Sequence, residues 1–298
     1  MKLTDLIFEA DGKPKAVVMA GGGGAGKSTF LKQVDTNVPV LNPDKYVEGQ
    51  DMHLAAASKM VEKEVGEMVD QRKSFIWDTT ASNPAKVQGL LEAGYDVMMV
   101  MVYTHPIISF ISNFQRERKI PKIGVLSTWA GSYGLIEQYR KMLGSNFHLV
   151  SNTRGGQYDK EIKGFNAAAQ KGGEALGDFL ESLGMETKST FSKAVEMSKE
   201  DAEAFGALIN QTDIPQDDAG GMKYLQRDFL KTKHLYDKQG IDRLKKRYDA
   251  YLKQKANADA KYINTLEQIA DLLSSPAIKG MEAEEASSVA GKVQQFLS

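Results

Sequence analysis

Residues 16–28, Ala-Val-Val-Met-Ala-Gly-Gly-Gly-Gly-Ala-Gly-Lys-Ser, join a short apolar run to a complete G-x-x-x-x-G-K-S signature. This spacing is typical of a phosphate-binding loop, in which glycines let the backbone turn tightly and aim successive N–H groups at phosphate oxygens. The helix expected to start near Lys27 would point its positive dipole end at the same charge. The stretch therefore predicts a nucleotide-phosphate site at the end of the first strand.

The signature also assigns roles to single residues. Lys27 is expected to hold the β- and γ-phosphates of a nucleotide, and Ser28 to ligate Mg²⁺. The loop alone does not distinguish an ATPase, a GTPase and a small kinase, and ATP becomes the predicted cofactor only with the motifs described below. The other residues expected to contact the nucleotide phosphates are Gly21, Gly22, Gly23, Gly24, Ala25, Gly26 and Thr29.

The composition of the chain argues against several classes of protein. The chain has 298 residues, a formal charge of -1, no cysteine and 4 histidines, so it offers neither a disulfide framework nor a cysteine-based zinc site. No apolar run approaches the length of a membrane span, and residues 1–10 carry Asp5 and Glu9 where a signal peptide needs an apolar core. We expect a cytoplasmic protein with no membrane partner.

Strand-like and helical patterns alternate through the first half of the chain. The expected strands are residues 16–20, 38–41, 74–77, 95–103 and 147–150, and the expected helices include 1–8, 84–93, 107–114 and 125–143. Strands alternating with helices predict an α/β fold of the P-loop NTPase type, with a parallel sheet of about five strands and helices on both faces.

The pattern changes after Asn152, because no strand-like run follows. A helix is expected over residues 164–183, a capping box opens another at Ser198, residues 211–221 are expected to be a linker, and long helices should run from Met222 until Ser275-Pro276. We therefore predict a P-loop domain over residues 1–185 and an all-helical extension or small bundle over residues 186–298.

Two aspartates stand at strand ends, where ligands bind in open α/β sheets. Asp44 follows the second strand and could accept the proton of an attacking hydroxyl, although Asp is also common in such turns. Asp78 ends the third strand and could hold Mg²⁺ or orient the acceptor; the alternative is a strand-end cap. Asp78 has no acidic neighbour, which argues against a motor-type ATPase, and the missing Asn-Lys-x-Asp motif argues against a GTPase.

Two further features complete the predicted donor site. The basic stretch Arg116-Glu117-Arg118-Lys119 could neutralise charge developing in phosphoryl transfer, through Arg116 or Arg118, or could be a solvated helix end. Asn152 follows the last strand, where topology alone would let it contact a nucleotide base.

Together these motifs resemble the P-loop kinase family that contains the zeta toxins and the 5′-hydroxyl polynucleotide kinases. The resemblance covers about residues 14 to 155 and rests on the loop, on Asn42-Pro43-Asp44, on Asp78-Thr79-Thr80 with Asn83-Pro84, and on residues 116–121. It implies transfer of the γ-phosphoryl group of ATP to a hydroxyl, with Asp44 as general base and lid arginines on the phosphates. The polynucleotide kinases have an arginine three residues beyond the base, where this chain has Val47, which weakens the case for a nucleic-acid end as substrate.

The leading hypothesis is thus a kinase acting on a hydroxyl of a nucleotide, a sugar nucleotide or a nucleic acid. Residues 223–261 hold twelve Lys and Arg against five Asp, interleaved with tyrosines, so they could contact nucleic acid weakly or could be the solvated faces of long helices. The rival hypothesis is a nucleotide-binding structural or interaction protein whose helical C-terminal region carries the function.

Overall fold

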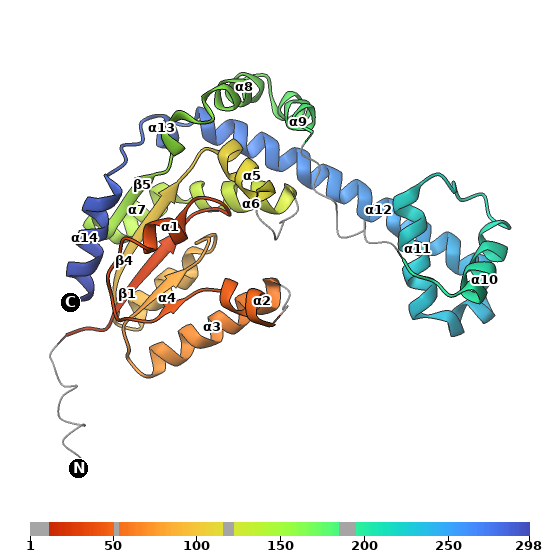
Figure 1. The fold of residues 1–298 in the computed structure, drawn as a ribbon, viewed down its shortest axis with the longest axis horizontal. Coiled ribbons are helices and arrows are strands. Elements are labelled where there is room, and N and C mark those ends of the chain that lie inside the picture. Colours follow the sequence, from red (N-terminus) through yellow and green to blue (C-terminus); the bar gives the residue numbers. More distant parts are fainter. Residues whose placement is uncertain (1–11, 51–53, 116–121, 185–194) are drawn as a thin grey trace, which may run out of the picture.

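The computed structural model describes residues 12–50, 54–115, 122–184 and 195–298 (Figure 1). Its centre is a five-stranded sheet in the order β2-β3-β1-β4-β5, in which all neighbouring strands are parallel. The strands are β1 (Lys15–Ala20), β2 (Val40–Leu41), β3 (Phe75–Asp78), β4 (Asp96–Tyr103) and β5 (Phe147–Ser151). The predicted parallel sheet of five strands is confirmed.

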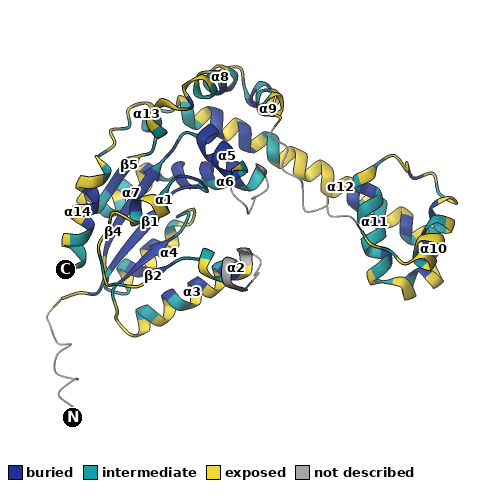
Figure 2. Ribbon diagram, in the orientation of Figure 1, coloured by how far each residue is buried: buried dark blue, intermediate teal, exposed yellow. Residues whose placement is uncertain are grey.

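Helices cover both faces of this sheet, as predicted. In β1, Val17 and Met19 point to the face covered by α1 (Lys27–Leu31) and α14 (Ala286–Leu297), whereas Val18 and Ala20 point to the other face. The helices that pack on that other face are α3 (Leu54–Asp70), α4 (Pro84–Glu92), α5 (Pro106–Phe114), α6 (Lys122–Tyr133) and α7 (Ile136–Leu143). Figure 2 shows the buried strands between these layers.

Two helices that the sequence predicted as continuous are broken. Residues 125–143 form α6 and α7, and residues 164–183 form α8 (Asp159–Ala169) and α9 (Gly173–Ser182). At the second break Gly172 has a φ of 107°, a left-handed value that other residues rarely adopt. The expected helix over residues 1–8 and the aspartate and glutamate within residues 1–10 lie outside the described residues.

The expected helix ends agree better with the structure. The side chain of Asn83 accepts a hydrogen bond from the backbone N–H of Ala85 at the start of α4, and that of Ser198 accepts one from Asp201 at the start of α10. The remaining helices are α2 (Asp44–Gln50), α10 (Lys199–Ile209), α11 (Ala219–Lys231), α12 (Lys233–Ser274) and α13 (Pro276–Lys279). α12 thus ends where Ser275-Pro276 predicted.

α12 connects two bodies (Figure 1). Its first part packs with α10 and α11 around a core of seven buried side chains; we call residues 195–251 the distal bundle. Residues 252–261 are exposed at every position, and we call them the stalk. Its last part, from Tyr262 onward, joins the core beside the sheet, and we call residues 12–184 and 262–298 together the sheet domain.

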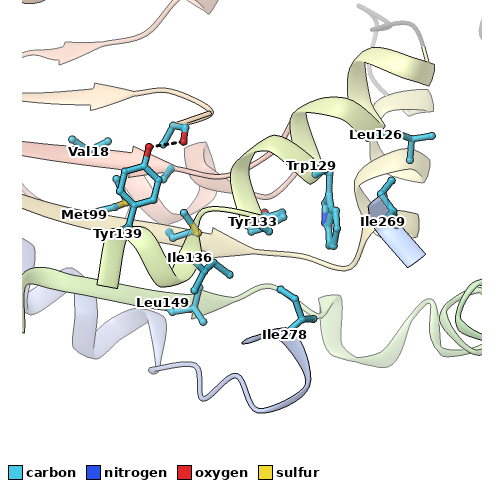
Figure 3. Close-up of a cluster of buried hydrophobic side chains, with 14 of the residues drawn as sticks. Val18, Met99, Leu126, Trp129, Tyr133, Ile136, Tyr139, Leu149, Ile269 and Ile278 are labelled. Atoms are coloured by element: carbon cyan, nitrogen blue, oxygen red, sulfur yellow. Dashed lines mark hydrogen bonds between the residues drawn. The ribbon is translucent and has the colours of Figure 1, made fainter. Parts of the chain in front are cut away.

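The last part of α12 lies tightly on the sheet domain. A Cβ atom added at Gly173 of α9 would lie 2.8 Å from Cγ of Glu267, so only glycine permits this approach of α9 to α12. Ile269 of α12 belongs to the same buried cluster as Leu126 and Trp129 of α6 (Figure 3). Tyr139 in that cluster donates a hydrogen bond of 2.7 Å to the carbonyl of Ala81.

The helices beyond residue 194 are therefore divided between the two bodies. The boundary predicted at residue 185 falls in a stretch that the structure does not describe and stays a prediction. Among the described residues, no helix combines the length and the apolar character needed to cross a bilayer.

Candidate functional site

The glycine-rich loop between β1 and α1 is closely surrounded by protein. Gly26 has a φ of 100°, and a Cβ atom there would lie 2.4 Å from Nδ2 of Asn152. Gly21 has a φ of 139°, and its added Cβ atom would lie 2.7 Å from the carbonyl oxygen of Val102. Both positions therefore need glycine for two reasons, the backbone conformation and the lack of space.

The side chain of Lys27 folds back over this loop. Its Nζ donates a hydrogen bond of 2.9 Å to the carbonyl of Gly21 and lies 3.6 Å from Oδ1 of Asp78 at the end of β3. Only 14% of the Lys27 side chain and 8% of the Asp78 side chain are exposed. The ammonium group is thus held at the carboxyl ends of β1 and β3, where a nucleotide phosphate would enter the loop.

Asn42 connects this pair to the second strand. Its Nδ2 donates to Oδ2 of Asp78 at 3.0 Å, and its Oδ1 accepts from the backbone N–H of Asp44 at 2.8 Å. Asn42 therefore links Asp78, the partner of Lys27, to the backbone N–H of Asp44. Asn42 was not predicted as a site residue, although its place beside Asp44 at the end of β2 was a usable signal.

Ser28 and Thr29 lie exposed in the first turn of α1. Because α1 has only five residues, its dipole is smaller than that of a full-length helix, and the expected contribution of the helix end to phosphate binding shrinks accordingly. The loop N–H groups and Lys27 are the stronger candidates for binding a phosphate.

Asn152 lies against the phosphate loop. Its Nδ2 donates to the carbonyl of Ala25 at 2.8 Å, its backbone N–H donates to Tyr103, and its carbonyl accepts from Oγ1 of Thr104. The side chain that the sequence assigned to a nucleotide base thus supports the loop backbone in this structure. Base contact by Asn152 stays a prediction.

Two aromatic residues of α6 complete the support and were missed by the sequence analysis. Trp129 Nε1 donates to the carbonyl of Thr104 at 2.8 Å, and Tyr133 donates to the carbonyl of Val102 at 2.7 Å. Burial raises the pKa of Tyr133, so its hydroxyl stays protonated and remains a donor. No local pattern in α6 reveals that it packs on a loop about a hundred residues earlier in the chain.

His105 is a buried titratable group at the start of α5. Its Nδ1 accepts from the backbone N–H of Ile107, and Nε2 lies 2.9 Å from Oδ1 of Asn166. Burial lowers the pKa of His105 to about 4, so the ring is neutral at pH 7 and caps the helix. Nothing in this arrangement suggests proton transfer.

A cavity of about 200 Å³ opens beside Asp78, between the end of β3 and the helices α3 and α4. Its lining includes Trp77, Glu62 and Lys86 as well as Asp78. A substrate in this cavity would lie next to the chain of side chains that ends at Lys27. The predicted Arg116 and Arg118 lie outside the described residues, and within the described ranges no group of three or more metal-binding side chains occurs.

The basic residues of the distal bundle are partly neutralised within it. Arg243 and Arg247 both pair with Asp228, and Lys245 pairs with Asp213. The tyrosines of this region pack on one another or on these arginines, for example Tyr248 on Tyr251. These pairs neutralise part of the positive charge of the region, and weak nucleic-acid contact through residues 223–261 stays a prediction.

Part of the chain matches a known family. Residues 2–124 match the family model described as Zeta toxin. The matched stretch contains the glycine-rich loop, Asp44 and Asp78. The resemblance to a P-loop kinase of the zeta toxin type, expected from the motifs, is thereby confirmed over these residues. No curated protein matches the chain.

Several solved structures align with part of the chain. The AvrRxo1-ORF1:-ORF2 complex with ATP matches with 16% identity and a TM-score of 0.39, covering 49% of this chain and 57% of that one. The PezAT toxin-antitoxin system of Streptococcus pneumoniae matches with 20% identity, a TM-score of 0.36 and coverages of 47% and 69%. A sulfotransferase domain from the Synechococcus olefin synthase also matches, with 14% identity, a TM-score of 0.31 and coverages of 59% and 74%. This chain spans little more than half the length of the first of these.

Proposed function

We propose that this protein is an ATP-dependent kinase that transfers the γ-phosphoryl group to a hydroxyl of a nucleotide, a sugar nucleotide or a nucleic acid. The observation that carries the proposal is the connected set Lys27, Asp78, Asn42 and Asp44, with distances of 3.6, 3.0 and 2.8 Å between successive partners. A phosphate-binding ammonium group and a candidate base thereby lie at the same edge of the sheet, at the ends of β1 and β2 on either side of β3.

Each residue has a role in this proposal. The loop N–H groups and Lys27 bind the phosphates of ATP, because Lys27 can exchange its present carbonyl partner for phosphate oxygens. Asp44 accepts the proton of the acceptor hydroxyl as its oxygen attacks phosphorus. Arg116 or Arg118 would stabilise the charge that develops on the transferred group.

The oxygen donors present fit Mg²⁺. Asp78 offers a carboxylate beside the loop and Ser28 an exposed hydroxyl, and Mg²⁺ commonly takes one or two such groups together with substrate phosphates and water. These two residues would hold the ion, which would neutralise charge on the β- and γ-phosphates. Asn42 would keep the Asp78 carboxylate oriented toward the loop.

The test is an assay of Asp44→Asn against Asp70→Asn, a matched change at an exposed position at the end of α3. We expect Asp44→Asn to leave ATP binding almost intact and to lower turnover about 10²- to 10⁴-fold, whereas Asp70→Asn changes neither. Labelled ATP should be offered with UDP-sugars, nucleosides, 5′-hydroxyl oligonucleotides and base-hydroxylated DNA. An unchanged rate in Asp44→Asn removes Asp44 from the mechanism.

The same screen separates the kinase from the rival function. A protein that binds ATP without transfer to any acceptor, while its helical C-terminal region forms a stable complex, would be a nucleotide-binding interaction protein. The stalk and the distal bundle favour keeping this alternative, because they place a helical body outside the sheet domain (Figure 1).

A further inference from the structure

A second cavity, of about 300 Å³, lies between the end of β4, the start of α5 and the helices α8, α12 and α13. Figure 1 shows α8, α13 and the end of α12 together at this edge of the sheet domain. Its described lining shares no residue with the cavity beside Asp78 and includes no member of the set Lys27, Asp78, Asn42 and Asp44. It is therefore separate from the proposed site of phosphoryl transfer.

A buried histidine orients one amide of this cavity. His105 Nδ1 accepts a hydrogen bond from the backbone N–H of Ile107, so the proton of the neutral ring is on Nε2, which donates to Oδ1 of Asn166 at 2.9 Å. Asn166 thus uses its carbonyl oxygen on the histidine and keeps its NH₂ group for another partner. Among the described residues, nothing accepts a hydrogen bond from that NH₂ group.

Tyr103 contributes a hydroxyl to the same cavity. Its ring packs on Trp129 and Tyr133, with ring centroids 6.3 and 5.1 Å apart. Burial raises the pKa of Tyr103 to about 12, so the hydroxyl keeps its proton at pH 7. Within the ranges that the structure describes, this hydroxyl has no hydrogen-bond partner, whereas Tyr133 and Tyr139 of the same cluster both donate to carbonyls. A ligand in the cavity would supply the acceptor that Tyr103 lacks.

The charge of the lining favours an anion. Lys279, at the end of α13, is the only charged side chain of the described lining and forms no ion pair with any described residue. Gln170 and Ser274 add neutral polar groups, and Leu273 and Ile278 add apolar surface. A phosphate group would bring nearly two negative charges to this one cation, and the described lining has neither an arginine nor a glycine-rich turn to bind it. A carboxylate, with a single negative charge, matches the lining better.

We propose that this cavity binds a small carboxylic acid, with its carboxylate on Lys279, the Tyr103 hydroxyl and the Asn166 amide, and its carbon skeleton against Leu273 and Ile278. The cavity volume of about 300 Å³ is at the lower end of the range of ligand pockets and limits the acid to a small molecule. The proposal does not depend on the kinase function, because the acid binds here without reacting.

A panel of carboxylates tests the proposal on the intact protein. Butyrate, succinate and benzoate are offered with the corresponding amides as uncharged controls and phenyl phosphate as the phosphate alternative. Saturation-transfer NMR measures binding, and tryptophan fluorescence gives a second readout because Trp129 packs on Tyr103. We expect at least one carboxylate to bind, and its amide or phosphate counterpart to bind about tenfold more weakly or not at all.

Two substitutions locate the site. Tyr103→Phe removes only a hydroxyl that has no partner among the described residues, so it should leave the Tm without ligand unchanged and weaken carboxylate binding about tenfold. Lys279→Gln should weaken binding about three- to fivefold, since the ammonium group is exposed. Lys163→Gln, at an exposed position of α8 outside the cavity lining, is the matched control and should leave binding unchanged.

Binding of a carboxylate that weakens in Tyr103→Phe and Lys279→Gln but not in Lys163→Gln supports the proposal. Three results overturn it: no carboxylate of the panel binds at millimolar concentration, phenyl phosphate binds more tightly than benzoate, or Tyr103→Phe binds the carboxylate as tightly as the unmodified protein.

Discussion

The sheet domain and the distal bundle are stabilised in different ways. The sheet domain buries large apolar clusters on both faces of a five-stranded sheet, and its largest buried side chains include Trp129, Tyr133 and Phe75. The distal bundle has a core of only seven buried side chains. A body this small gains little from apolar burial alone, so polar contacts must supply a larger share of its stability.

Those polar contacts centre on two aspartates. Asp228 pairs with Arg243 at 2.9 Å and Arg247 at 3.0 Å. Asp218 caps α11 and accepts hydrogen bonds from Tyr248 at 3.0 Å and Tyr251 at 3.2 Å. Arg243 and Arg247, two of the twelve basic residues of the stretch 223–261, thus stabilise the bundle internally.

Unfolding of the two bodies can be followed by separate measurements. Both tryptophans, Trp77 and Trp129, lie in the sheet domain, so tryptophan fluorescence follows that body alone. Hydrogen exchange of α11 amides follows the distal bundle.

The largest effects are expected from core truncations. Leu266→Ala removes a fully buried side chain of the sheet domain, and Leu244→Ala removes one of the distal bundle; each should cost about 2–5 kcal/mol of unfolding free energy. Leu266→Ala should lower the denaturant midpoint of tryptophan fluorescence. Leu244→Ala should leave that midpoint in place and speed exchange in α11. A shift of the fluorescence midpoint by Leu244→Ala would mean that the bodies unfold together.

Asp228→Asn should have the next largest effect, confined to the distal bundle. It leaves Arg243 and Arg247 without their charged partner in a partly buried setting, at a cost of about 2–3 kcal/mol. We expect faster exchange in α11 with unchanged fluorescence. Asp237→Asn, at an exposed position of α12, is the control, and equal effects of the two variants would contradict the role of Asp228.

A smaller effect is expected where α9 meets α12. Gly173→Ala places a methyl group within 2.8 Å of Glu267 and should cost about 1–3 kcal/mol, measured by the fluorescence midpoint. Gly89→Ala in α4, where nothing lies within 4 Å of the new methyl group, should raise stability by about 0.5–1 kcal/mol. If Gly89→Ala also lowers the stability, the loss in Gly173→Ala cannot be assigned to the contact with Glu267.

The smallest effect is the response to acid. Burial raises the pKa of Asp218, but hydrogen bonds from the N–H of Gly221 and from Tyr248 and Tyr251 outweigh it, and the pKa lies below its usual value of 3.8. Such a carboxylate stabilises the fold above the unfolded pKa and loses that contribution as pH falls through the folded value. Exchange in α11 should therefore accelerate below about pH 4. In an Asp218→Asn variant the acceleration of α11 exchange below about pH 4 should be smaller. If exchange in the variant depends on pH in the same way as in the unmodified protein, Asp218 is not the group responsible.

The sequence predicted what local patterns encode. The loop glycines, the buried run of β4 and the caps at Asn83 and Ser198 depend on neighbours within a few residues, and the structure agrees with them. The support of the loop by Trp129 and Asn152, and the cover of the sheet by α14, join residues more than a hundred positions apart. Such contacts follow from chain topology, which no short pattern contains.

The exposed stalk also makes α12 a mechanical lever. One end is clamped beside α6, whose Trp129 lies against Gly22 of the phosphate loop, and the other end carries the distal bundle. From Leu266 to Leu244 the helix spans about 33 Å, so a tilt of about 10° at the clamp displaces the far end by about 6 Å. A small change of angle at the end of α12 beside the phosphate loop would therefore move the distal bundle by about one helical turn.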